Sequence, residues 1–253
     1  MNLLEIKNLN IGDNSGRRIL RNFEFILKKD SIHALIGESG SGKTSFATSI
    51  FHLTHPELSM NFDSYSILGK SYSDYKEDDW VRLRGKKICL IPQNPGKSFH
   101  PYISIGKQMK DYFQLKSQGL ANKESILEIL EKIQIRDAHK TYKALPKNLS
   151  GGEKQRILIA MAISVEPEIL VADEPTTALD SINEKLTLSL LYSLIKNKRI
   201  GLVLITHDMR LVEELADDVT VLKSGELIEK ITLLNKDMNK LQSEYSRRLV
   251  LKS

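Results

Sequence analysis

Eight consecutive residues near the start of the chain combine glycines with one lysine and one hydroxyl. They follow an apolar run, 32–36, and fit the pattern G-x-x-x-x-G-K-[ST]: Gly37, Glu38, Ser39, Gly40, Ser41, Gly42, Lys43 and Thr44. Glycines let the backbone turn so that successive N–H groups face one anion, and the helix expected next points its positive end at the same place. Lys43 supplies a mobile charge, and the Thr44 hydroxyl suits Mg²⁺. The pattern predicts a site for the phosphates of a nucleotide.

Two carboxylates, Asp173 and Glu174, follow the apolar run 169–172. A buried strand delivers its C-terminal residues to the edge of an α/β sheet where ligands bind. We expect Asp173 to hold the hydration shell of Mg²⁺ and Glu174 to orient or deprotonate an attacking water. Alone, the pair fits solvated acids in a turn before Pro175 equally well. The glycine-rich loop in the same chain favours the catalytic interpretation.

A second anion-directed device lies in the segment 149–156. Ser150 is placed to cap a helix, and the two glycines after it expose the N–H groups of the first turn. The residues expected to face a ligand here are Ser150, Gly151, Gly152 and Glu153. Two phosphate-binding segments in one chain, 37–44 and 149–156, predict a γ-phosphate held between two protomers.

The chain resembles the nucleotide-binding subunits of ABC transporters, and the resemblance runs from about Leu3 to Lys230. Further motifs in the family's order are Gln93 after the run 88–91, the segment 178–180, and His207 after the run 202–205. The resemblance implies ATP and Mg²⁺ as ligands, with Glu174 and His207 as catalytic residues. It also implies metal contacts from Thr44, Gln93 and Asp173, and a hydrogen bond from His207 to the γ-phosphate.

Within that family, the segments 84–101, 172–180 and 244–249 are similar to those of peptide, nickel and opine importers. This finer resemblance implies a subunit at the cytoplasmic face of the cell membrane, peripheral to it. Its implied partners are transmembrane permease subunits, a second ATPase of the same or a homologous kind, and, indirectly, an extracytoplasmic substrate-binding protein. One departure concerns the base: residues 11–20 contain no aromatic side chain to stack on adenine, and Arg17 or Arg18 is the candidate replacement.

Two other classes compete with a transporter subunit. A soluble ABC-type ATPase acting on nucleic acid or ribosomes would need the long coiled-coil insertion or tandem cassettes of such proteins, and each motif occurs here once. We therefore expect no nucleic-acid partner. A non-catalytic nucleotide-dependent scaffold would have no need of Glu174 and His207.

The elements that must position these residues are those of an α/β P-loop NTPase of the ABC ATPase type. Alternating strands at 3–11 and 23–27 predict an antiparallel N-terminal portion, and apolar runs at 32–36, 88–91, 169–172 and 202–205 predict a mostly parallel central sheet. A helical insert is expected at about 97–165. We expect residues 1–230 to form the ATPase domain. Residues 231–253 are expected to form a short basic tail, because six basic residues face two acidic ones from Lys230 onward.

Composition limits the remaining possibilities. The 253 residues include 37 Lys and Arg against 32 Asp and Glu, a net charge of +5 that is scattered rather than gathered in a stripe. No apolar run is long enough to span a bilayer, and the first ten residues have no apolar signal core. The single cysteine, Cys89, excludes an internal disulfide and a cysteine-built metal site. A reducing cytoplasm fits these features.

Overall fold

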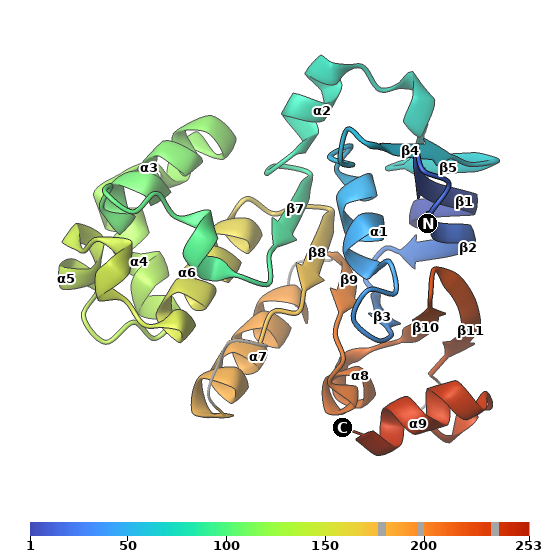
Figure 1. The fold of residues 1–253 in the computed structure, drawn as a ribbon. Coiled ribbons are helices and arrows are strands. Elements are labelled where there is room, and N and C mark those ends of the chain that lie inside the picture. The colour runs from blue at the N-terminus through green and yellow to red at the C-terminus, as the bar shows by residue number, and fades with distance from the viewer. Residues whose placement is uncertain (177–180, 197–199, 234–237, 253) are drawn as a thin grey trace.

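The computed structural model describes residues 1–176, 181–196, 200–233 and 238–252. Its centre is a parallel sheet (Figure 1). The parallel strands, in spatial order, are β10 (Asp218–Lys223), β3 (Ile32–Ile36), β9 (Gly201–Ile205), β8 (Ile169–Asp173) and β7 (Ile88–Ile91). Every residue of β3, β8 and β9 is buried, as expected of apolar strands covered on both faces.

An antiparallel portion adjoins this sheet. Its strands are β1 (Asn2–Asp13), β2 (Arg18–Lys28), β4 (Leu58–Asn61), β5 (Ser64–Ile67) and β6 (Lys70–Ser71). β1 pairs with β2, β4 and β5, and β5 pairs with β6. β11 (Glu226–Thr232) joins the two portions, because it pairs antiparallel with β10 and bridges to β2. The predicted fold class, a mostly parallel sheet with an N-terminal antiparallel portion, is confirmed.

The helices fall into groups around this sheet. Their bounds are α1 (Lys43–Ile50), α2 (Glu77–Leu83), α3 (Ile105–Lys116), α4 (Lys123–Lys132), α5 (Ala138–Lys143), α6 (Gly151–Ser164), α7 (Ser181–Lys196), α8 (Met209–Leu215) and α9 (Glu244–Lys252). Helices α3 to α6 gather on the side away from the antiparallel strands (Figure 1). Phe113, Ile126, Leu130 and Ile157 are buried in a separate core there. The helical insert is therefore present between β7 and β8. In the described part of the chain, no helix is both long and apolar enough to span a bilayer.

The C-terminal segment, expected from its charge to be a short basic tail, packs against the rest of the domain in its described part. Leu233 and Leu241 are buried, and Tyr245 and Leu249 pack against the same core. Charge alone is a poor guide here because Arg247 and Arg248 of α9 are exposed while Tyr245 and Leu249 of the same helix pack against the core.

His33 on β3 is a neutral member of the core beneath the glycine-rich loop. Its Nδ1 lies 2.7 Å from the carbonyl oxygen of Ile26, its Nε2 lies 2.8 Å from Thr220 Oγ1, and its ring stacks on Phe25. Burial lowers the pKa of His33 to about 4, despite the opposing effect of the Ile26 carbonyl. The strand that leads into the loop therefore buries an imidazole whose charged form is disfavoured by burial.

We expect the free energy of unfolding to fall as the pH drops from about 6.5 to 4. Across that window the unfolded chain binds a proton at His33 and the folded chain does not, which costs at most about 1.4 kcal/mol per pH unit. Denaturant unfolding at several pH values should show a shallower slope for His33→Gln than for the wild type. His55→Gln, at a mostly exposed side chain, is the control. Equal slopes for wild type and His33→Gln would contradict this account.

Candidate active site

The glycine-rich loop joins β3 to α1 and forms one wall of a cavity of about 640 Å³. The cavity is lined by Arg17, Arg18, Ile19, Ser39, Gly40, Gly42, Lys43, Thr44, Ser45, Gln93, Asp173, Glu174 and Ser224. Gly42 is the residue before α1, and it caps the helix without a side chain. The N–H groups of the first helical turn therefore face the cavity, as the sequence predicts.

The loop can adopt this shape only because of its glycines. A Cβ atom on Gly37 would lie 2.1 Å from the carbonyl oxygen of Leu222, on β10. Gly42 has a φ of +106°, and a Cβ there would lie 2.7 Å from Leu20 Cδ2. Side chains at these two positions would push the loop away from the strands that support it.

Lys43 lies inside the loop with its ammonium group on the loop's own carbonyls. Its Nζ donates to the carbonyl oxygens of Gly37 at 2.8 Å and Glu38 at 2.9 Å. The residue is 7% exposed, and burial lowers its pKa although Glu174 and Asp173 oppose the shift. The partly desolvated Lys43 ammonium is stabilised when an anion enters the loop, because the attraction between opposite charges is strong away from water. The geometry therefore favours a phosphate ligand.

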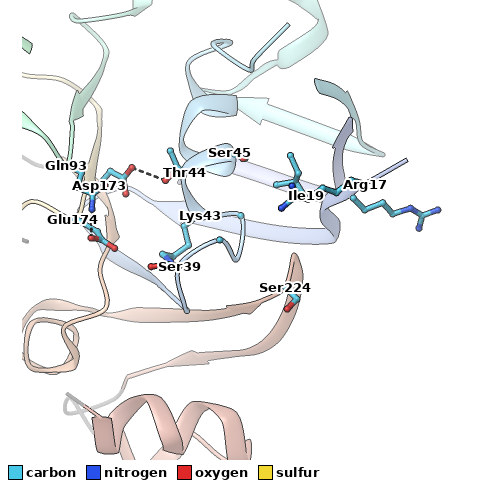
Figure 2. Close-up of a pocket in the computed structure, with 13 residues that line it drawn as sticks. Arg17, Ile19, Ser39, Lys43, Thr44, Ser45, Gln93, Asp173, Glu174 and Ser224 are labelled. Atoms are coloured by element: carbon cyan, nitrogen blue, oxygen red, sulfur yellow. Dashed lines mark hydrogen bonds between the residues drawn. The ribbon is translucent and has the colours of Figure 1, made fainter. Parts of the chain in front are cut away.

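The acidic edge of the cavity is built by the C-terminal end of β8. Asp173 is 9% exposed, and burial raises its pKa, although a hydrogen bond from Thr44 opposes the shift. Thr44 Oγ1 donates to Asp173 Oδ2 at 3.3 Å, and Figure 2 shows the two side chains facing each other beside the loop. A buried carboxylate, a hydroxyl and the nearby amide of Gln93 are hard oxygen donors, the kind that Mg²⁺ prefers.

Glu174 links three strand ends. Its Oε2 accepts a hydrogen bond from Gln93 Nε2 at 2.8 Å, and its Oε1 lies 3.3 Å from His207 Nδ1. Its own N–H donates to the carbonyl oxygen of Ile205 at 2.8 Å. The backbone of Glu174 has a φ of +45°, in the left-handed region that non-glycine residues adopt uncommonly. The structure thus brings together the three residues that the sequence places after β7, β8 and β9.

The Ser150 segment forms the expected helix cap. Glu153 N donates to Ser150 Oγ at 3.2 Å, and Ser150 N donates to Glu153 Oε2 at 2.8 Å. The Glu153 carboxylate therefore binds the start of its own helix, α6, in this structure. Ser150, Gly151 and Gly152 do not line the cavity of the glycine-rich loop. Within one chain, the two predicted phosphate-binding segments therefore do not share a cavity.

The cavity has contributors that the sequence patterns do not reveal: Ile19, Ser45 and Ser224. Ser224 belongs to the turn between β10 and β11, and only the sheet order brings that turn beside the loop. Arg17 and Arg18 do line the cavity, but Figure 2 shows the side chain of Arg17 pointing away from the loop. The predicted motif at 178–180 lies outside the described residues.

Comparison with known proteins places this geometry in a family. Residues 20–177 match the family model described as ABC transporter. The chain belongs to the ABC transporter family. It is accordingly an ATP-binding and ATP-hydrolysing transport subunit, and the match includes the glycine-rich loop, Gln93, the capped helix α6 and the Asp173–Glu174 edge.

Relatives of this ABC subunit share most of its length. The oligopeptide transport ATP-binding protein OppD of Lactococcus lactis is 34% identical over 92% of this chain and 70% of its own. The metal-staphylopine import system ATP-binding protein CntD of Staphylococcus aureus is also 34% identical, over 92% of this chain and 86% of its own. Among solved structures, a dimeric post-hydrolysis state of the ATP-binding cassette MJ0796 bound to ADP and Pi has a TM-score of 0.78. It is 25% identical, over 91% of this chain and 99% of its own.

We expect Gly42→Ala to abolish nucleotide binding and to lower the free energy of unfolding by about 1–3 kcal/mol. The added methyl group would strain a left-handed backbone and overlap Leu20 and the Ile19 carbonyl. Isothermal titration with ATP and denaturant unfolding measure the two effects. Gly119→Ala is the control, because a Cβ at Gly119 meets no described atom within 4 Å. Normal ATP affinity in Gly42→Ala would show that the loop geometry does not govern binding.

Proposed function

We propose that this ABC subunit drives the import of peptides or of metal ions and their chelates, nickel and opine-like complexes included. The proposal is supported by the relatives named for oligopeptide transport and metal-staphylopine import. The observation that carries the ATPase mechanism is the desolvated Lys43 ammonium, which lies within one cavity with the Asp173–Glu174 edge. ATP is the nucleotide that we assign to this cavity.

Mg²⁺ is the metal that fits the acidic edge. Thr44, Asp173 and Gln93 would hold it through oxygen atoms, with the remaining positions left to water and phosphate. Among the described residues, no three His, Cys, Asp or Glu side chains cluster closely enough to hold a metal alone. That observation agrees with an ion that binds together with the nucleotide. When bound, Mg²⁺ would neutralise charge on the β- and γ-phosphates.

Glu174 is the residue that we assign to water activation. Gln93 and His207 contact its two carboxylate oxygens, so the carboxylate is oriented before a substrate arrives. A γ-phosphate beside Lys43 would lie near Glu174, which could then position a water or take its proton. We assign Lys43 and His207 to the charge that develops on the transferred phosphoryl group.

A second protomer completes the site in our proposal. Ser150, Gly151 and Gly152 of the partner would close on the γ-phosphate, because the same residues lie outside the loop cavity in their own chain. The helical insert, about residues 97–165, begins a few residues after Gln93 and would transmit closure to permease subunits. We place the chain peripherally at the cytoplasmic face of the membrane. An extracytoplasmic substrate-binding protein would deliver the cargo to the permease.

A pair of variants separates chemistry from binding. We expect Glu174→Gln to retain ATP affinity and to lose at least about 100-fold in phosphate release, because only the water-activating carboxylate changes. We expect Lys43→Ala to weaken ATP binding itself by about tenfold or more, because it removes charge-assisted hydrogen bonds to phosphate. Titration calorimetry and phosphate-release assays report the two properties. Hydrolysis at the wild-type rate in Glu174→Gln would remove this residue from the catalytic role.

A further inference from the structure

Helix α9 contacts the glycine-rich loop from the far end of the chain. The backbone N–H of Glu38 donates to the hydroxyl oxygen of Tyr245 at 3.2 Å. The Tyr245 ring also lies 4.7 Å from Lys223 Nζ, next to Ser224 of the cavity wall. Figure 1 shows α9 alongside the β10–β11 hairpin. The glycine-rich loop is therefore contacted by Tyr245, which lies after the β10–β11 hairpin in sequence and packs on Lys223 of that hairpin.

Tyr245 is held in place by an anchor on β11. The Glu229 carboxylate accepts hydrogen bonds from Gln242 N at 2.7 Å, from Ser243 N at 3.1 Å and from Ser246 Oγ at 2.7 Å. Burial alone would raise the pKa of Glu229, but these hydrogen bonds together lower it below its ordinary value. The carboxylate thus holds the two residues before α9, and Ser246 in its first turn, against β11. The position of the Tyr245 side chain is thus set by the fold.

The peptide groups of Glu38 are fixed at both ends. Its N–H binds Tyr245, and its carbonyl oxygen accepts hydrogen bonds from Lys43 Nζ at 2.9 Å and from Ser41 N at 3.2 Å. The carbonyl thereby points into the loop toward the lysine. Without the tyrosine hydroxyl, water would accept the exposed Glu38 N–H, and the peptide would be free to rotate away from this arrangement.

We propose that Tyr245 is a positioning residue for nucleotide binding: its hydroxyl accepts the Glu38 N–H and holds the glycine-rich loop in the shape that receives the phosphates. The role rests on the proposed function, since it concerns the same ATP site. A loop that is already ordered loses less conformational freedom when the ligand binds, so the effect falls on affinity. Tyr245 itself does not line the cavity.

The test compares two tyrosine-to-phenylalanine variants of the full chain. Tyr75 is a matched control: it is half-buried, its hydroxyl donates to the Ile67 carbonyl at 2.8 Å, and Lys70 Nζ lies 4.5 Å from its ring. Titration with ATP and Mg²⁺ should give a Kd about 3- to 10-fold higher for Tyr245→Phe, the range expected for one lost hydrogen bond. Tyr75→Phe should stay within about twofold of the wild type. In steady-state assays, KM should rise for Tyr245→Phe while kcat stays within about twofold.

Hydrogen exchange gives a direct readout of the proposed contact. In the nucleotide-free wild type the Glu38 amide should be protected, and Tyr245→Phe should exchange it faster while Tyr75→Phe should not. A wild-type chain that binds ATP, together with an unchanged Kd in Tyr245→Phe, would overturn the positioning role alone. Equal losses of affinity in both variants would also overturn it, because they would report general destabilisation. A wild-type chain that binds no ATP would instead overturn the proposed function itself.

Discussion

The structure depends on one electrostatic constraint: a lysine ammonium is buried within a loop whose own carbonyls are its nearest partners. The buried strand β3 ends at Ile36, so the loop begins inside the domain at Gly37. Lys43 Nζ then donates to the carbonyl oxygen of Gly37. Gly37 then allows the chain to pass over β10, and Gly42 allows α1 to begin without a side-chain cap. The result is a cradle of N–H groups around a desolvated charge, which an entering phosphate stabilises.

The opposite wall of the cavity follows from sheet order rather than from local sequence. β7, β8 and β9 are parallel neighbours, so residues that follow them meet at one edge. Glu174 lies between Gln93 and His207 at that edge, and its hydrogen bond with Gln93 connects the edge to the segment that leads into the helical insert. In the proposed mechanism, a displacement of Gln93 when phosphate binds would reach α3, which begins at Ile105, through residues 94–104. This connection would carry movement from the ATP site to a partner.

The sequence predicts the residues that line the cavity more completely than the elements around them. The bounds of β3 and β7, the Ser150 cap and the acidic end of β8 are predictable because each depends on local periodicity or on one capping residue. Strands β4 to β6 escaped prediction because they have two to four residues each and depend on pairing within the antiparallel portion. Trp80 of α2 stacks on the ring of His52 and packs against Tyr72 and Tyr75, contacts that no local sequence pattern predicts. The docking of α9 was equally hidden, because the Glu229 carboxylate binds backbone amides that carry no sequence signal.

A crystal structure of the Glu174→Gln chain grown with Mg²⁺ and ATP would test the central claim most directly. The account predicts a triphosphate inside the Gly37–Thr44 loop, with Lys43 Nζ moved from the Gly37 carbonyl to the phosphate oxygens. It also predicts a metal ion between Thr44 and Asp173. A nucleotide bound elsewhere, or one bound while Lys43 keeps its hydrogen bonds to Gly37 and Glu38, would contradict the account.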